Sequence, residues 1–427
     1  MGKGIAKILS GLLVFGMVAG LVPAVPGGTV NAKATEINGQ NATAEPHTHC
    51  VCGTGNLSVE RHTHKEETWT GISKLSDINR EGNYYLTQDV TLTSAWTCQR
   101  NVNLCLNGHS ITRTAKEYYD QNGNNAVIII KNNVDFTLTD CKGTGTITHK
   151  QGVSGEGVYN DGRFFMYNGI IFGNNGGVKN PGMFFMYGGT ITSNTANNGG
   201  GVDNAGTFTM DGGTITSNTA NNGGGVYNDN AGRFIMYGGT ITGNKAEQTY
   251  GTEYGGGVYN QGTFNMYGGE ITNNTATVGG GGVFNKGTFT MSGGEITSNS
   301  SESYGGGVCY SSSQLFKMSG TVNITENKVG TTPNNLYLWN GQQVSASGLT
   351  SGAEIGVTTQ IVPINDSSVP ITSDSVSVNC FSSDKSDYET AIDENSKVVL
   401  KKKTAVEAPS ITKQPQPVSV KVGETAT

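Results

Sequence analysis

The stretch GGTITSNTANNGGGV occurs twice in the chain, at residues 188–202 and again at residues 212–226. It is part of a longer unit that recurs between about Gly152 and Asn327: G-G-G-V-x-N, a short turn, x-F-x-M-x-G-G and x-I-x-x-N. Successive units are 20 to 32 residues apart. Self-similarity at such a period is the sequence signature of a solenoid, in which each unit packs only on its neighbours.

Three apolar columns run through these units in register. Phenylalanine and methionine two residues apart share one face of a strand, so we expect both to point inward. The columns are Val158, Val178, Val202, Val226, Val258, Val283 and Val308; Phe164, Phe184, Phe208, Phe234, Phe264, Phe289 and Phe316 with Met166, Met186, Met210, Met236, Met266, Met291 and Met318; and Ile171, Ile191, Ile215, Ile241, Ile271 and Ile296.

No single unit can bury these side chains, but units stacked at about 4.8 Å form one continuous core and pair their backbones. We therefore predict an all-β fold, a single-stranded right-handed parallel β-helix with three short strands per coil. Asparagine follows the valine strand and the isoleucine strand. We interpret both asparagine columns as structural ladders at the corners, because stacked amides hydrogen-bond to one another.

Composition agrees with this fold. The 427 residues include 64 glycines but only 10 prolines, and 14% are charged, which favours tight turns between strands over charge-driven disorder. The 27 basic and 33 acidic residues give a net charge of −6. A nucleic-acid partner is not expected, because no basic stripe is present. We expect a monomer.

The first 34 residues have the pattern of a signal peptide. Lys3 and Lys7 precede an apolar run from Ile8 to Leu21, and a small-residue stretch ends at Ala34. No later stretch approaches the length of a membrane span, so we expect a secreted mature chain without one.

The rest of the chain divides by pattern. We assign residues 35–74 to a His/Cys-rich leader, 75–150 to irregular N-terminal capping coils and 151–328 to the regular repeats. Residues 329–404 continue as ragged C-terminal coils, and 405–427 form a linker with the start of a further domain.

The GGGV-x-N and F-x-M-x-GG coils, over about residues 75 to 400, resemble the β-helix regions of pectate-lyase-like surface proteins and adhesins, especially those of gut Firmicutes. The segment APSITKQPQPVSVKVGETAT resembles the opening strand of a bacterial immunoglobulin-like domain. These resemblances imply a secreted or extracellular protein, attached to the cell wall or surface where a C-terminal continuation supplies an anchor. They are specific for fold and weak for function, because one scaffold serves many activities.

The leader carries six side chains that could bind zinc. They are His47, His49, Cys50, Cys52, His62 and His64. Their spacing departs from the usual C-x₂₋₄-C, so a zinc knuckle, a flexible leader and a disulfide all stay open. Farther along, Cys105 and Cys141 occur in similar contexts, which fits a stacked pair or two buried thiols.

We find no catalytic constellation in the repeats. A polysaccharide lyase or glycoside hydrolase needs clustered acidic or basic groups. Glu270 and Glu295 share a column without a basic neighbour, and Asp203 and Asp211 are separated by a strand and a corner. We interpret all four as a solvated face and expect no enzymatic activity.

Exposed aromatic residues are the one outward feature that folding does not explain. Phe165 and Tyr167 fall on one coil and Phe185 and Tyr187 on the next, with Tyr237 and Tyr267 farther along. Contiguous exposed rings mark contact surfaces, and sugar rings stack on them. The alternative is that the leader or the loop at 116–125 covers them.

The leading functional hypothesis is therefore a non-catalytic, adhesin-like β-helix that binds an extracellular glycan or a host surface protein. A polysaccharide-acting enzyme of the same fold and a passive surface spacer are the alternatives.

Overall fold

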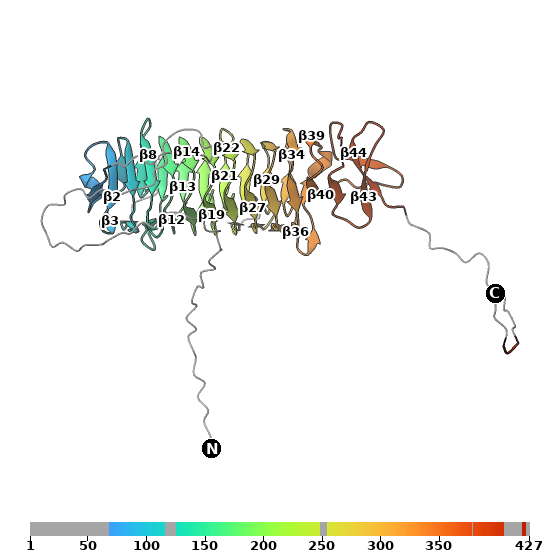
Figure 1. Ribbon diagram of the computed structural model, residues 1–427, viewed down its shortest axis with the longest axis horizontal. Coiled ribbons are helices and arrows are strands. Elements are labelled where there is room, and N and C mark those ends of the chain that lie inside the picture. Colours follow the sequence, from blue (N-terminus) through green and yellow to red (C-terminus); the bar gives the residue numbers. More distant parts are fainter. Residues whose placement is uncertain (1–67, 116–124, 248–253, 378, 405–420, 424–427) are drawn as a thin grey trace, which may run out of the picture. The chain divides into compact units, whose positions relative to one another are not determined.

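The structure is a computed structural model, and it describes residues 68–115, 125–247, 254–377, 379–404 and 421–423. The prediction of a right-handed parallel β-helix is confirmed: coils stack along one axis from β2 through β14 and β22 to β34 (Figure 1). Apart from strands, the described residues form two 3-10 helices, η1 (Leu75–Asp77) and η2 (Trp339–Gly341). In this part of the chain no helix has the length and apolar character needed to cross a membrane.

The phenylalanine and methionine columns form one parallel sheet, which we call the Phe/Met sheet. Its strands follow one another coil by coil. They are β1 (Thr70–Ile72), β2 (Gly82–Leu86), β5 (Val102–Cys105), β8 (Asp135–Thr139), β11 (Arg163–Met166), β14 (Met183–Met186), β18 (Thr207–Met210), β22 (Arg233–Met236), β26 (Thr263–Met266), β30 (Thr288–Met291), β34 (Phe316–Gly320) and β39 (Val344–Leu349). The first strand, β1, lies within the range that the sequence assigned to the leader.

The valine and isoleucine columns form two further parallel series, joined where β38 pairs with β40. The valine series is β4 (Trp96–Cys98), β7 (Ile128–Ile130), β10 (Val158–Asn160), β13 (Val178–Asn180), β17 (Val202–Asn204), β21 (Val226–Asn228), β25 (Val258–Asn260), β29 (Val283–Asn285), β33 (Val308–Tyr310) and β38 (Leu336–Leu338). The isoleucine series is β3 (Val90–Leu92), β6 (Ile111–Arg113), β9 (Thr146–His149), β12 (Ile170–Phe172), β15 (Thr190–Thr192), β19 (Thr214–Thr216), β23 (Thr240–Thr242), β27 (Glu270–Thr272), β31 (Glu295–Thr297), β35 (Asn323–Thr325) and β40 (Glu354–Thr359), with β42 (Phe381–Ser383) paired to β40.

A fourth short strand, which the sequence pattern did not predict, follows the isoleucine strand in the longer coils. These strands are β16 (Thr195–Asn198), β20 (Thr219–Asn222), β24 (Lys245–Ala246), β28 (Thr275–Ala276), β32 (Ser300–Ser301) and β36 (Lys328–Val329), and β37 (Thr332–Pro333) pairs antiparallel with β36 at the end of this series. At the C-terminal end, β41 (Ser368–Pro370), β44 (Val398–Lys402) and β43 (Tyr388–Ile392) form a small antiparallel sheet.

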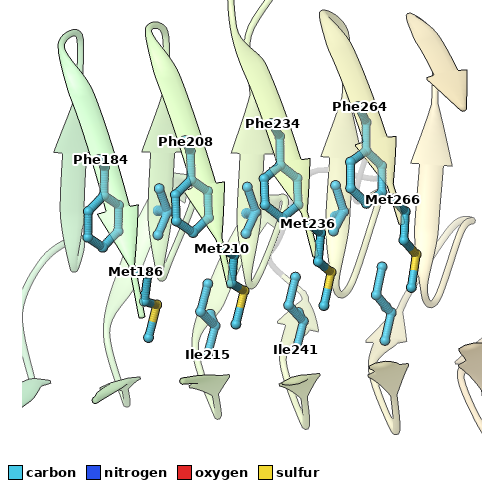
Figure 2. Close-up of a cluster of buried hydrophobic side chains, with 14 of the residues drawn as sticks. Phe184, Met186, Phe208, Met210, Ile215, Phe234, Met236, Ile241, Phe264 and Met266 are labelled. Carbon is cyan, nitrogen blue, oxygen red and sulfur yellow. The ribbon is translucent and has the colours of Figure 1, made fainter. Parts of the chain in front are cut away.

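The predicted inward columns form the core. Figure 2 shows Phe184, Phe208, Phe234 and Phe264 stacked ring on ring, with a methionine below each phenylalanine. Ring centroids from Phe164 to Phe316 in this column are 4.4 to 4.8 Å apart, and the rings are fully buried. The spacing equals that of a parallel ladder, so every ring contacts the next one without bending the backbone.

The two asparagine columns are buried ladders, as predicted. After the valine strands, each Nδ2 donates to Oδ1 of the next coil over 2.6 to 2.7 Å, from Asn160 to Asn285. After the isoleucine strands, the next asparagine's Oδ1 accepts from both the backbone N–H and Nδ2, as Asn218 does for Asn194. This second ladder satisfies buried corner groups that water cannot reach.

The second ladder extends beyond the residues that the sequence marked. It continues through Asn327 and Asn335 to Asp384, whose Oδ1 accepts from Asn335 Nδ2 at 2.6 Å. At the other end, His149 Nδ1 lies 2.9 Å from Asn174 Oδ1 and Nε2 lies 2.9 Å from the Asn125 carbonyl oxygen. Burial lowers the pKa of His149. Both ends of the ladder are therefore closed by side chains of other types.

Candidate functional site

The aromatic residues singled out in the sequence lie on the outer surface of the Phe/Met sheet. In β11 and β14, Phe165 pairs in register with Phe185, and their ring centroids are 5.1 Å apart with planes 9° from parallel. Tyr167 and Tyr187 follow these strands and stack at 4.8 Å. All four side chains are half-buried. We call these four residues the aromatic face.

Tyr237 and Tyr267 form a separate pair farther along the same corner. Their rings stack at 5.1 Å, and they are 53% and 47% exposed. One coil separates them from the aromatic face, and it carries Thr209 beside Phe185 and Asp211 at the tyrosine position. The structure therefore divides the six predicted residues into a group of four and a group of two.

A groove of about 580 Å³ lies where β11, β14 and β18 begin, and its lining residues Arg163 and Met183 precede Phe165 and Phe185 by two positions on the same strands. Its lining includes Asn132, Asn133, Arg163 and Met183. The Arg163 guanidinium forms a two-pronged ion pair with Asp135, with Nε to Oδ1 at 2.6 Å and a terminal nitrogen to Oδ2 at 2.7 Å. Polar donors and acceptors thus lie at one end of the strands whose other end carries tyrosine.

A second polar site lies on the outer face of the valine strands, where sequence reasoning found none. The middle residue of V-x-N forms a column there, with Tyr159, Lys179, Asp203 and Tyr227 on four successive coils. Lys179 and Asp203 line a cavity of about 240 Å³, together with Glu156, Ala196, Asn197 and Asn198. We call this the Glu156 cavity.

In later coils aromatic residues fill this face. Tyr227 stacks on Tyr259 at 5.3 Å, and Tyr259 stacks on Phe284 at 5.4 Å. Tyr259, Phe284, Cys309 and Tyr337 form a buried cluster outside the main core. Burial raises the pKa of the Cys309 thiol to about 12, so this thiol is not a ready nucleophile.

Glu156 occupies a corner position that is glycine in neighbouring coils, Gly176 and Gly200. The residue is 7% exposed, and its Oε2 has no hydrogen-bond partner in the described part of the protein. A buried carboxylate oxygen without a donor is costly, so it marks a place where a ligand or water donor would be favourable.

The carboxyl groups of the cavity hold their protons more tightly than usual. Burial raises the pKa of Asp203 to about 6, against the lowering effect of Lys179, and nearby Asp229 and Glu156 raise it further. Burial also raises the pKa of Glu156, against the lowering effect of Lys179 and Arg113. The site combines carboxyl groups and an ammonium group within one small cavity.

The sequence interpretation of Asp203 as part of a solvated face is therefore wrong. Asp203 is half-buried because β16, the unpredicted fourth strand, contributes Asn197 and Asn198 to the wall beside it. Asp211 is half-buried as well, and burial raises its pKa. Glu270 and Glu295 are exposed, as expected.

Two further expectations concern cysteine and metal. Cys105 is buried and pairs in register with Thr139, while Cys141 is exposed; none of the five cysteines in the described residues forms a disulfide. The zinc candidates of the leader, the signal peptide, most of the loop at 116–125 and most of the immunoglobulin-like segment lie outside the described residues. Among the residues that the structure describes, no group of three or more His, Cys, Asp and Glu side chains could hold a metal ion.

Replacing Asp203 with asparagine should change how stability depends on pH. The raised pKa means that the folded chain binds this proton more tightly than the unfolded chain, so wild type loses stability as pH rises from about 4 through 6. The free energy of unfolding of Asp203→Asn should therefore exceed that of wild type by about 1 to 2 kcal/mol at pH 7.5, and this difference should disappear near pH 4.

Thermal and urea unfolding across this pH range measure the effect. Asp366→Asn, at an exposed aspartate, is the matched control and should leave the pH profile unchanged. Parallel profiles for wild type and Asp203→Asn would show that Asp203 titrates normally.

Comparison of the chain with family models, curated proteins and solved structures gives no match.

Proposed function

We propose that the protein is a secreted or cell-surface, non-catalytic binding protein of the adhesin type, and that its aromatic face binds an extracellular glycan. The observation that carries the proposal is the pair of stacked ring columns, Phe165 on Phe185 and Tyr167 on Tyr187, on adjacent strands of a rigid sheet. Core packing does not account for these rings, because they point away from the buried columns.

Aromatic pairs at this spacing suit sugar rings. A pyranose presents an apolar face of C–H groups, which packs on a tyrosine or phenylalanine ring, while its hydroxyls take up hydrogen bonds at the edge. The groove beside Arg163 and Asn133 offers such bonds within reach of the same strands. The second pair, Tyr237 and Tyr267, lies along the same corner and offers a further contact for a longer chain.

A glycan is favoured over a host protein because of the size and polarity of the surface. Only four half-buried rings are contiguous, and the neighbouring outward positions are Thr209 and Asp211. A stable protein interface generally needs about 800 Å² from each partner, with a larger apolar centre.

The proposal is tested by affinity electrophoresis of the mature chain in gels that contain pectin, alginate, chondroitin, xylan or mannan. At least one polysaccharide should retard the wild type. The double variant Phe185→Ala, Tyr187→Ala should bind it at least about tenfold more weakly, because two stacking contacts are worth roughly 1.5 to 3 kcal/mol together.

The matched control changes the same two positions on another coil, Thr290→Ala with Ser292→Ala, and should bind as wild type does. Equal retardation of wild type and the aromatic double variant would refute the assignment. Release of unsaturated or reducing ends from any of these polysaccharides would refute the non-catalytic assignment and support the alternative of a polysaccharide-acting enzyme.

A further inference from the structure

The Glu156 cavity has the features of a built polar site and lies apart from the aromatic face. Glu156 is nine-tenths buried and is one of the residues that line the cavity, and its Oε2 has no hydrogen-bond partner among the described residues. Lys179 and Asp203 lie on the next two coils of the same face. The inference drawn from this cavity goes beyond the proposed function, which concerns the Phe/Met sheet.

Glycines shape the wall of the cavity on these coils. Gly176 follows Glu156 in its column and places no side chain beside it. A Cβ at this position would contact Glu156 Cγ at 3.6 Å. Gly199, with φ of 59°, turns the chain in the cavity wall, where a Cβ would lie 2.3 Å from the Val202 carbonyl oxygen. Beyond Tyr227, tyrosine and phenylalanine fill the equivalent space.

The chemistry of the lining selects a ligand class. Glu156 and Asp203 supply hydrogen-bond acceptors, Lys179 supplies a donor, and the amides of Asn197 and Asn198 supply both. Lys179 lowers the pKa of both carboxyl groups and Arg113 lowers that of Glu156, but Asp229 adds a third carboxylate near Asp203, so the site disfavours an anionic ligand. A neutral polyol, whose hydroxyls donate and accept at once, matches this set.

The volume of the cavity and the aromatic residues on either side of it also favour a sugar. A cavity of about 240 Å³ lies below the usual range for drug-sized ligands and holds a single ring. Tyr159 on the coil before Lys179 and Tyr227 on the coil after Asp203 place an aromatic residue on either side of the charged pair. We propose that the Glu156 cavity binds one neutral hexose residue through its hydroxyl groups.

Saturation-transfer NMR with the methyl glycosides of glucose, galactose and mannose tests this proposal on the mature chain. At least one glycoside should bind at millimolar concentration. Glu156→Gln and Asp203→Asn preserve side-chain shape and should each weaken that binding about tenfold, because a charged acceptor becomes a neutral one. Unchanged thermal unfolding at pH 4 confirms that each variant is folded.

Glu270→Gln, at an exposed glutamate of the isoleucine series, is the matched control and should bind as wild type does. Absence of binding by all three glycosides, or binding within about twofold of wild type in both cavity variants, would overturn the proposal.

The aromatic double variant Phe185→Ala, Tyr187→Ala separates the two sites. It should bind the methyl glycoside as wild type does while its affinity for polysaccharide falls. Loss of methyl glycoside binding in this variant would place the sugar on the aromatic face and would equally overturn the cavity assignment. Failure of the polysaccharide test alone would affect only the proposed function.

Discussion

Replacing Asn218 with alanine should lower the free energy of unfolding by about 3 to 5 kcal/mol. Its Nδ2 donates to the Ile191 carbonyl oxygen at 2.9 Å and to Asn244 Oδ1 at 3.0 Å, and its Oδ1 accepts from the backbone N–H and Nδ2 of Asn194. All these groups are buried. Alanine leaves the Asn194 backbone N–H without its acceptor, at a cost of about 1 to 3 kcal/mol, and removes one buried hydrogen bond from each of the other groups, at about 1 kcal/mol each.

Urea unfolding followed by circular dichroism measures this loss. Asn198→Ala is the matched control, since Asn198 belongs to the preceding coil, is exposed and accepts one long bond of 3.4 Å from Asn222. The control should change stability by no more than about 0.5 kcal/mol. Similar values for the two variants would mean that the buried asparagine ladder contributes no more than surface asparagine does.

Phe234→Ala should destabilise the chain by about 3 to 5 kcal/mol. The Phe234 ring is fully buried and stacks on Phe208 at 4.8 Å and on Phe264 at 4.6 Å. Removing it opens a cavity in the middle of the core, and the parallel ladders on both sides prevent the neighbouring coils from collapsing into it.

Thermal unfolding measures this effect against two further variants. Phe234→Leu should restore much of the lost stability because it keeps most of the buried volume. Phe172→Ala removes a ring that is 45% exposed on β12 and should cost less than about 1 kcal/mol. If Phe172→Ala lowered stability as much as Phe234→Ala does, the assignment of inward and outward columns would be contradicted.

The sequence predicted the regular coils because their side chains repeat in strict register. Valine, phenylalanine, methionine and isoleucine each occupy one column, and the structure buries every member of these columns. The ends of the asparagine ladder escaped notice because the register breaks there. Asn335 follows Asn327 by 8 residues instead of a full coil, and His149 and Asp384 are different residue types.

The aromatic face could be predicted from sequence because it follows from strand alternation: residues flanking an inward methionine must point outward. The Glu156 cavity could be predicted only in part. The V-x-N register alone places Lys179 beside Asp203. Their burial depends on β16 (Thr195–Asn198), and this strand could not be predicted because its residues do not form a buried apolar column. The glutamate in the glycine column at Glu156 was the available signal.

The most direct test of the binding function is a crystal structure of the mature chain with an oligosaccharide of the polysaccharide that it binds most tightly. The predicted result is a pyranose ring packed on Tyr167 and Tyr187 or on Phe165 and Phe185, with its chain running toward the groove beside Arg163. An oligosaccharide bound elsewhere, with all four of these rings free of sugar, would contradict the account.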